Sequence, residues 1–336
     1  MSRNERAKLR RTALRAGWAI ALAGLCSGLM PASAQAEQKK FLIGIVELQL
    51  TNPFFGTLEK SAVDTAKQHG LDVMTAEAST AGDSATQIGA IENMINRGVK
   101  GITLDPANAT ALVPIVKKAR DAGIVVVTTN TSLAPMTVAD AAYETDNLQA
   151  GILIGRWAKA TMGSKPARIA MLDYDLSDKT SKARHDGFLK GFGIADGDPH
   201  IVGSALTVGN AETGQTAMEN LLSAHPDINL IYTINEPAAQ GAFFAIRQAR
   251  RDVLVTSIDG NCSGVRSVAD GTIGATVMQF PIRMGEMAVD AVIKAVDDGV
   301  KPSGFHNTGT VLITDHPAAG VESQDSKWGL AHCWGK

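Results

Sequence analysis

Short apolar runs alternate with longer segments of helical periodicity along most of this 336-residue chain. In the first half, the apolar runs predict strands at 41–46, 71–75, 101–104 and 124–128. The segments between them predict helices near 55–69, 84–97 and 109–121. Gly70, Gly98 and Gly123 fall at the ends of these helices, where glycine is the preferred residue. Strands separated by helices of this length predict βαβ units and a parallel sheet.

The same alternation begins again near Asp146. Further strands are predicted at 168–172, 200–205, 230–233, 253–258, 274–278 and 308–314. Further helices are predicted near 146–161, 178–192, 211–224, 236–250, 262–269 and 281–298. Two consecutive runs of βαβ units predict two α/β lobes. Because no low-complexity linker separates the two runs, we expect the lobes to share several short crossings.

Residues 1–36 have the organisation of a secretory signal peptide. A basic segment precedes an apolar stretch at 16–30 that is too short for a comfortable membrane span. Two small-x-small sequences follow, Ala32-Ser33-Ala34 and Ala34-Gln35-Ala36. We therefore expect residues 1–36 to be removed on export and the mature protein to be periplasmic.

Charge excludes one class of partner. Residues 1–36 hold six basic side chains and one acidic side chain, so the mature chain keeps 26 basic and 33 acidic side chains, a net charge near −7. Nucleic-acid binding rests on lysine and arginine that neutralise phosphates, so no nucleic-acid partner is expected. No second apolar stretch of membrane length appears, which predicts a soluble mature protein.

Two cysteines remain after export, Cys262 and Cys333. An even pair in an exported protein predicts a disulfide, which would tie the C-terminal tail to the body of the protein. The alternative is two unpaired thiols.

The turn Asn52-Pro53-Phe54-Phe55 lies where the first predicted strand ends and the first helix begins. Pro53 suits the first helical position, because its missing N–H would have no partner within the helix. Two adjacent rings are unusual at an exposed helix start. Either one ring belongs to the core and the other closes the strand–helix corner, or a ring faces a ligand at the carboxyl end of the strand, where open α/β sheets bind ligands.

Side chains with amide or carboxylate groups follow the strands of both halves. They are Asn52, Asp105, Asn108, Asn130, Asp173, Asp175, Asn235, Glu236, Asp259, Asn261 and Gln279. Such groups offer paired hydrogen-bonding atoms that match the adjacent hydroxyls of a sugar. Helix capping is the alternative explanation, but it accounts for neither Gln279 nor the paired rings.

Signatures of catalysis and of cofactor binding are absent from the sequence. It has no Gly-x-Ser-x-Gly elbow and no phosphate-binding loop, and Gly191-Phe192-Gly193 falls at a helix end instead of after a strand. The histidines lack metal-ligand spacing, so neither a metal nor a cofactor is expected. Asp173 and Asp175 leave open a carboxylate pair for glycoside hydrolysis, although turn formation explains them equally well.

Several motifs, taken in order, resemble one family. They include Ile43-Gly44-Ile45, Asn52-Pro53-Phe54-Phe55, Asp105-Pro106, Asp146-Asn147, His225-Pro226-Asp227, Asn235-Glu236-Pro237-Ala238, Ile258-Asp259-Gly260 and Gln279 with Pro281. Over about 41–315 the chain resembles the periplasmic ribose-type sugar-binding proteins that serve ABC importers. The C-terminal Cys333-Trp334-Gly335 resembles the fructose-type branch of that family, which favours a ketose.

This resemblance implies two doubly wound parallel-sheet lobes joined by three crossings. The N-terminal lobe would comprise 41–145 plus 280–307, the C-terminal lobe 146–279 plus 308–320, and the tail 321–336. It also implies a monosaccharide ligand, a membrane permease partner and a monomeric, non-enzymatic receptor. The ligand-binding residues carried over from the family or expected at the strand ends are Asn52, Phe54, Phe55, Asp105, Asn130, Arg184, Asn235, Asp259 and Gln279.

Two departures from the ribose binder argue against ribose itself. Asn130-Thr131 stands where that protein has an Asp-Arg pair, and Val208-Gly209-Asn210 lacks its second-lobe phenylalanine. Another small polar ligand, such as a furanone signal, a polyol or an amino acid, is the main alternative to a sugar. A DNA-binding regulator with the same core would need a helix-turn-helix module where this chain has a signal peptide.

Overall fold

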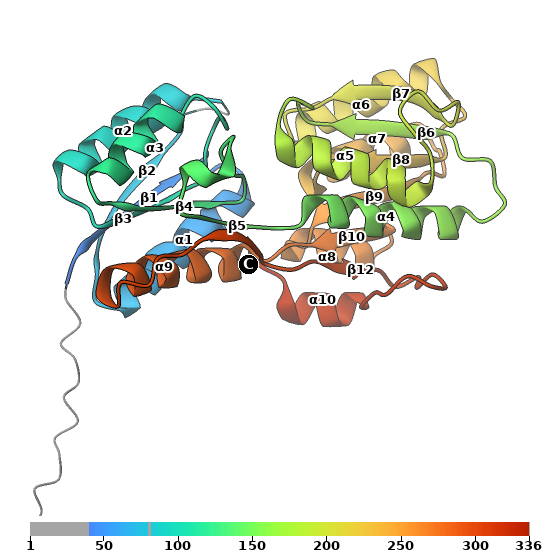
Figure 1. The fold of residues 1–336 in the computed structure, drawn as a ribbon. Helices are drawn as coiled ribbons and strands as arrows, with labels where there is room; N and C mark the ends of the chain where they lie inside the picture. Colours follow the sequence, from blue (N-terminus) through green and yellow to red (C-terminus); the bar gives the residue numbers. More distant parts are fainter. Residues whose placement is uncertain (1–39, 80–81, 336) are drawn as a thin grey trace, which may run out of the picture. The chain divides into compact units, whose positions relative to one another are not determined.

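The computed structural model describes residues 40–79 and 82–335. The predicted signal peptide, 1–36, lies outside the described residues. The strands form two six-stranded sheets, and helices pack on both faces of each (Figure 1).

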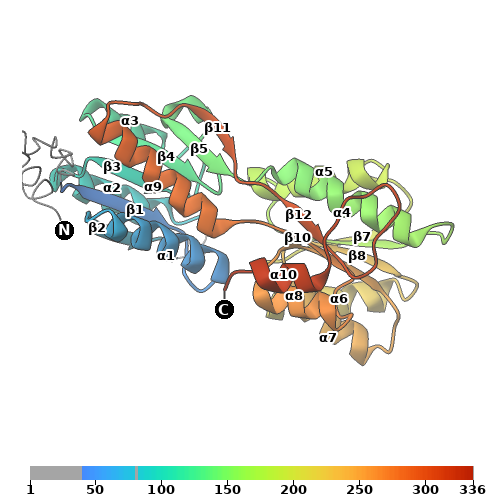
Figure 2. The same ribbon diagram turned by 90° about the horizontal axis from the view of Figure 1, so that it is seen from below.

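Sheet A has the strand order β11-β5-β4-β3-β1-β2, and all of its strand pairs are parallel. Its strands are β1 (Leu42–Glu47), β2 (Asp72–Glu77), β3 (Gly101–Leu104), β4 (Val125–Thr129), β5 (Ala141–Glu144) and β11 (Gly304–Asn307). The helices α1 (Pro53–Gln68) and α9 (Pro281–Asp297) cover one face and lie side by side (Figure 2). The helices α2 (Ser84–Asn96) and α3 (Val113–Asp121) cover the other face.

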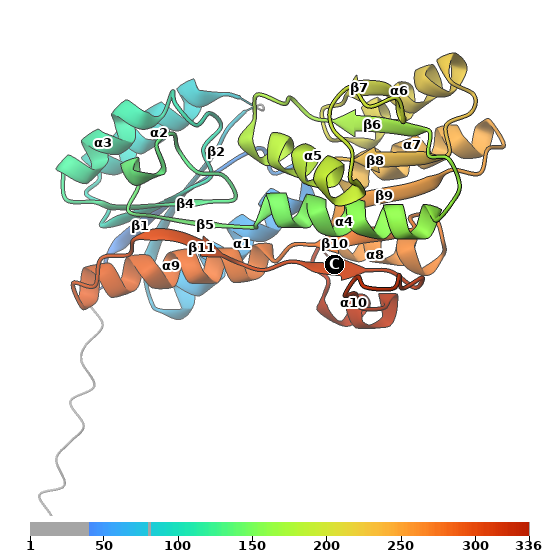
Figure 3. The ribbon, with the colours of Figure 1, turned by 45° about the vertical axis from the view of Figure 1, so that its right-hand side comes forward.

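Sheet B has the order β12-β10-β9-β8-β6-β7, and only its β10–β12 pair is antiparallel. Its strands are β6 (Ile169–Asp173), β7 (Ile201–Leu206), β8 (Leu230–Thr233), β9 (Leu254–Asp259), β10 (Ala275–Met278) and β12 (Val311–Ile313). One face carries α4 (Asn147–Met162) and α5 (Lys179–Phe192), which run side by side (Figure 3). The other face carries α6 (Ala211–Ala224), α7 (Glu236–Gln248) and α8 (Cys262–Ala269).

The chain crosses between the sheets three times: from β5 to α4, from β10 to α9, and from β11 to β12. The predicted fold of two doubly wound lobes joined by three crossings is therefore confirmed. In sheet A the strand order reverses between β1 and β3, and in sheet B it reverses between β6 and β8. In doubly wound sheets, ligands bind outside the carboxyl ends of the strands at such a reversal, so the fold itself indicates where to look for a site.

Several predicted elements differ from the structure. Strands β5 and β11 were not predicted from the sequence, and the strand predicted at 308–314 is shorter in the structure, where β12 covers only Val311–Ile313. Helix α3 begins at Val113 instead of near residue 109, because the Asn108 side chain accepts hydrogen bonds from the Thr110 and Ala111 amides and holds a turn there. The predicted tail, 321–336, contains a further short helix, α10 (Ser326–His332). The exact lobe boundaries stay a prediction.

Candidate functional site

The first part of the site lies at the carboxyl end of sheet A, on the turn that follows β1. Asn52 caps α1, and its Oδ1 accepts a hydrogen bond from the Phe54 amide at 2.9 Å. The two rings have different surroundings. Phe54 is buried in the core and packs edge-on against Phe55 and Trp334, each at 5.6 Å between ring centroids, whereas Phe55 is only half-buried. Of the two rings, Phe55 is therefore the more accessible.

Asp105 and Asn130 form a second group at the same end of the sheet. Asp105 directly follows β3 and is fully buried. The Asn130 Nδ2 donates to both carboxylate oxygens of Asp105, at 3.3 and 3.1 Å. Burial raises the pKa of Asp105 well above its usual range, the Asn130 hydrogen bond opposes that shift, and the charges of Asp178 and Glu144 add to it. Together the two side chains offer acceptor atoms and a fixed amide for hydroxyl groups.

Arg184, Asp259 and Gln279 form a buried network at the carboxyl end of sheet B. The Gln279 Nε2 donates to Asp259 Oδ1 at 2.8 Å, and the Arg184 Nη1 lies 3.9 Å from the same oxygen. Arg184 also donates to Asn147 Oδ1 at 2.8 Å and to the Ile234 carbonyl oxygen at 3.1 Å, which fixes its guanidinium group. The Gln279 Oε1 is buried and has no partner among the described residues.

Asp259 has a raised pKa and an unusual backbone conformation. Burial raises the pKa of Asp259 to about 6, although the Arg184 charge and the Gln279 hydrogen bond act against that shift. Its backbone also has an unusual φ of 151°. Among the described residues, the other non-glycine positions with positive φ are Asn130 and Arg250. Two of these three strained positions are predicted ligand-binding residues, and strain of this kind gathers at functional sites.

Glu236 holds the backbone next to this network, a role that was not predicted from the sequence. Its Oε1 accepts hydrogen bonds from the Gly260 amide at 2.8 Å and the Thr276 hydroxyl at 2.7 Å, and its Oε2 accepts one from the Asn261 amide at 3.0 Å. Burial, with the Asp259 charge, raises the pKa of Glu236 to about 8. Glu236 therefore holds the turn that carries Asp259.

Asn235 is a helix cap in this structure. Its Oδ1 accepts a hydrogen bond from the Ala238 amide at 3.1 Å, and its Nδ2 donates to the Gly209 carbonyl oxygen at 2.9 Å. Both ends of its amide are thus occupied by backbone groups. A ligand contact from Asn235 would have to use the second lone pair of Oδ1 or the second hydrogen of Nδ2.

The two acids left open as a carboxylate pair, Asp173 and Asp175, have different surroundings. Asp173 is buried against His185, whose Nδ1 lies 3.0 Å from its Oδ1, whereas Asp175 accepts a hydrogen bond from the Ser177 amide. The Asp173 hydrogen bond raises the pKa of His185 to about 9. His185, Asp186 and Asp196 form a cluster of side chains of types that can bind metals, and both ring nitrogens of His185 already lie beside carboxylate oxygens, Nδ1 at 3.0 Å from Asp173 Oδ1 and Nε2 at 2.9 Å from Asp196 Oδ1.

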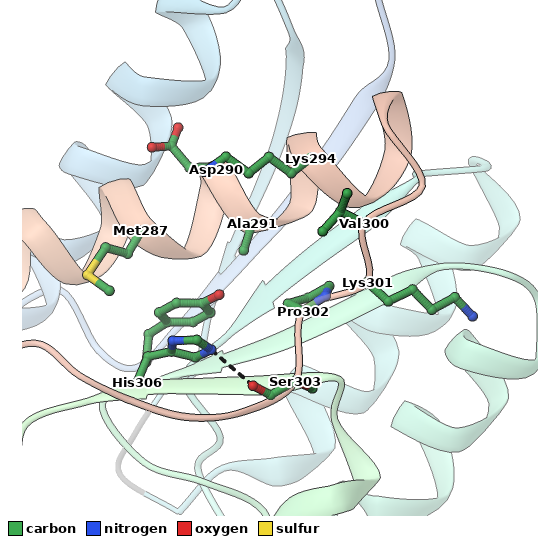
Figure 4. Close-up of a pocket in the computed structure, with 10 residues that line it drawn as sticks. Met287, Asp290, Ala291, Lys294, Val300, Lys301, Pro302, Ser303 and His306 are labelled. Carbon is green, nitrogen blue, oxygen red and sulfur yellow. Dashed lines mark hydrogen bonds between the residues drawn. The ribbon is translucent and has the colours of Figure 1, made fainter.

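A separate cavity of about 430 Å³ lies between α9 and the chain leading into β11 (Figure 4). It is lined by Tyr143, Met287, Asp290, Ala291, Lys294, Val300, Lys301, Pro302, Ser303 and His306. None of the predicted ligand-binding residues lines this cavity.

Among the helices of the described residues, none has the length and apolar character needed to span a membrane.

Comparison with known proteins identifies the family. A profile of the periplasmic binding protein domain matches residues 43–300. The chain is 32% identical to the ribose import binding protein of Bacillus subtilis over 259 residues, which cover 77% of this chain and 83% of that protein. A solute-binding protein of an ABC transporter from Actinobacillus succinogenes, solved with bound D-allose, superposes with a TM-score of 0.75 at 26% identity and covers 82% of this chain and 98% of its own.

A galactofuranose-binding protein superposes with a TM-score of 0.77 over 87% of this chain and 97% of its own, and at 24% identity this likeness shows the fold. The matched profile describes a binding domain, and the similar proteins are binding proteins. The prediction of a solute receptor that is not an enzyme is therefore confirmed. The chain belongs to the periplasmic binding protein family.

Proposed function

We propose that this protein is a periplasmic receptor that captures a monosaccharide between its two lobes and delivers it to the permease of an ABC importer. The observation that carries this proposal is the buried network of Arg184, Asp259 and Gln279, which ends in an unpartnered amide oxygen. The Asp259 carboxylate and the unpartnered Gln279 Oε1 offer hydrogen-bond acceptors side by side, and such acceptors match the neighbouring hydroxyl groups of a sugar. The sugars named for similar proteins, ribose and allose, belong to the same chemical class.

The ligand set would draw on both lobes. Asn52, Phe55, Asp105 and Asn130 would come from the end of sheet A, and Arg184, Asn235, Asp259 and Gln279 from the end of sheet B. Buried Phe54 would support the ring of Phe55. Closure of the lobes on the sugar would signal occupancy to the permease only if the ligand binds the closed state better than the open state.

The choice among sugars rests on two departures in sequence and on the chain's last residues. The Asn130-Thr131 pair and the ring-free segment 208–210 argue against ribose as the preferred ligand. The Cys333-Trp334-Gly335 ending resembles the fructose-type branch of the family, and that resemblance favours a ketose such as fructose. An amino acid is the alternative ligand, because the Arg184 Nε and one Nη1 hydrogen bind Asn147 and Ile234, and the remaining guanidinium hydrogens stay available to a carboxylate. We further propose that the protein acts as a monomer and is exported by cleavage of its signal peptide.

A thermal-shift screen tests the function. The mature protein would be heated with D-ribose, D-allose, D-fructose, D-apiose, myo-inositol and a set of L-amino acids. At 100 times its dissociation constant, a ligand that binds only the folded state stabilises it by about 2.7 kcal/mol, which is readily seen as a rise in Tm. A shift with a sugar, together with no release of sugar from glycosides, supports the receptor. A shift with amino acids alone, or turnover of glycosides, contradicts it.

A further inference from the structure

The cavity between α9 and the chain leading into β11 lies apart from the predicted ligand-binding residues and has walls of a different kind (Figure 4). Its volume of about 430 Å³ falls within the range of roughly 300–1,000 Å³ that is usual for small-molecule sites. The side chains of Met287, Ala291, Val300 and Pro302 give it apolar walls. A cavity of this size and lining can take a small molecule with an apolar body.

Tyr143 supplies a buried polar group to this cavity. The residue lies on β5, is only 4% exposed and lines the cavity. Its hydroxyl has no hydrogen-bond partner among the described residues. The hydroxyl of a buried tyrosine usually finds a partner, and a molecule bound in the cavity can supply one here.

The Tyr143 ring is held in place by its neighbour on the adjacent strand. Strands β5 and β11 pair in parallel with Tyr143 opposite His306, and the two rings stack at 4.6 Å between centroids and 11° between planes. The His306 Nε2 donates to the Ser303 carbonyl oxygen at 3.1 Å, which fixes the second ring (Figure 4). A hydrogen-bonding group on a fixed ring is preorganised, so little conformational freedom is lost when a ligand binds to it.

The Tyr143 hydroxyl is a hydrogen-bond donor near neutral pH. Burial raises the pKa of its phenol to about 12, and the charge of Asp290 adds to that rise. The phenol therefore keeps its hydrogen and can donate it to an oxygen of a ligand. A negatively charged oxygen accepts a stronger hydrogen bond than a neutral one.

The charges around the cavity favour an anion. Lys294 on α9 and Lys301 on the loop after it line the cavity, are exposed, and have no ion pair among the described residues. Asp290 is the acid among the described lining residues, and its Oδ1 lies 3.7 Å from the His69 Nε2. Figure 4 shows the Lys301 side chain extending outward, and the flexible stem of a lysine can turn its ammonium group toward a bound anion.

We propose that this cavity is a second binding site, for a small organic anion, in which the Tyr143 hydroxyl donates to an anionic oxygen and the Lys294 and Lys301 ammonium groups pair with its charge. The ligand is a carboxylate or phosphate carried on a small apolar group, which lies against the apolar walls. The proposal does not depend on the sugar receptor, because the predicted ligand-binding residues do not line this cavity.

Ligand-detected NMR titration of the mature protein tests the site with benzoate, phenyl phosphate, benzyl alcohol and inorganic phosphate at one ionic strength. Benzyl alcohol keeps the apolar ring without the charge, and inorganic phosphate keeps the charge without the ring. The better of the two aromatic anions is expected to bind at least about tenfold more tightly than either control, because ring and charge each contribute. Which of the two binds better tells carboxylate from phosphate.

Variants locate the bound anion. Tyr143→Phe removes only the hydroxyl and is expected to weaken binding of the better anion about tenfold, with an unchanged Tm because that hydroxyl has no partner to lose. Lys294→Met/Lys301→Met removes two charges and is expected to weaken it about threefold or more. Lys165→Met/Lys190→Met is the matched control, since both lysines are exposed and lie outside the cavity, and it is expected to bind the anion as wild type does.

Each outcome decides the proposal. It is overturned if neither aromatic anion binds, if benzyl alcohol binds equally well, or if Tyr143→Phe and the Lys294→Met/Lys301→Met variant keep wild-type affinity for the anion. Displacement of the anion by the sugar with the largest thermal shift would place it at the sugar site and would also overturn it. A protein that binds no sugar, but binds the anion with the expected variant effects, contradicts the proposed function and supports this second site.

Discussion

At the residue scale, the two phenylalanines of the first turn have separate tasks. Phe54 is buried between Phe55 and Trp334, so Phe54→Ala is expected to lower the free energy of unfolding by about 3–5 kcal/mol. Phe55 is only half-buried, so Phe55→Ala is expected to lower the stability of the protein less than Phe54→Ala does. It is expected to weaken sugar binding by about 1–3 kcal/mol, because the ring no longer stacks on the sugar. Urea unfolding and isothermal titration on both variants measure the two effects. Unchanged sugar affinity in Phe55→Ala would assign both rings to the core.

Asp259 carries the second prediction at this scale. Asp259→Asn turns one acceptor into a donor facing Gln279 and the sugar, so affinity is expected to fall about tenfold to a thousandfold, or roughly 1.4–4 kcal/mol. Stability without ligand is expected to change by about 1 kcal/mol or less, because the change removes repulsion from Glu236 as well as attraction to Arg184. Titration calorimetry with the best sugar measures the affinity. Full affinity in this variant would leave Asp259 as a turn residue only.

The sequence pattern correctly placed most of these polar residues near the ends of strands. It could not show which of them keep polar atoms free for a ligand. Asn235 looks the same in sequence as Asn130, yet backbone groups occupy both ends of the Asn235 amide. Glu236 belongs to the same pattern, yet its carboxylate oxygens accept hydrogen bonds from the Gly260 and Asn261 amides and the Thr276 hydroxyl.

At the scale of elements, the close approach of α4 and α5 positions Arg184. A Cβ added at Gly151 would lie 2.3 Å from the Arg184 carbonyl oxygen, so Gly151→Ala must push the two helices apart. We expect a loss of about 1–3 kcal/mol in stability, and a weaker affinity for sugar as Arg184 shifts. Gly89→Ala on α2 is the control, because a Cβ there meets nothing within 4 Å, and it is expected to stabilise by about 0.5–1 kcal/mol. Thermal unfolding and titration of both variants check this, and equal behaviour of the two would refute it.

A helix or strand could be predicted where its own residues show a clear apolar periodicity. The strands at 101–104 and 230–233 and the helix at 262–269 match the structure, because their apolar periodicity is strong. Strand β11, Gly304–Asn307, is mostly exposed at the edge of sheet A and contains a glycine and an asparagine, which are poor strand formers. Its pairing with β5 creates it, and that pairing joins distant parts of the chain, so no local signal could reveal it.

At the scale of the whole molecule, the chain end is tied back by covalent and aromatic contacts. Cys262, the first residue of α8, forms a disulfide with Cys333, and the Cys262 amide donates to the Trp334 carbonyl oxygen at 2.8 Å. Thiol titration of the denatured, unreduced mature protein is expected to find neither cysteine free. Reduction, or a Cys262→Ser/Cys333→Ser double variant, is expected to cost about 2–5 kcal/mol of stability. Two titratable thiols in the purified protein would exclude the bond in solution.

The position of Trp334 has a practical consequence for watching the protein work. Its ring packs edge-on against Phe54 on the first turn, and its indole N–H donates to the Gln279 carbonyl oxygen at 3.0 Å. One fluorophore thus contacts both Phe54 of the first lobe and Gln279 at a crossing between the lobes. Any rearrangement of these segments on sugar binding changes the surroundings of the indole. Its contribution to the tryptophan emission, alongside those of Trp157 and Trp328, therefore gives the protein a built-in optical signal, and the arrival of a sugar can be timed in a stopped-flow instrument without any added dye.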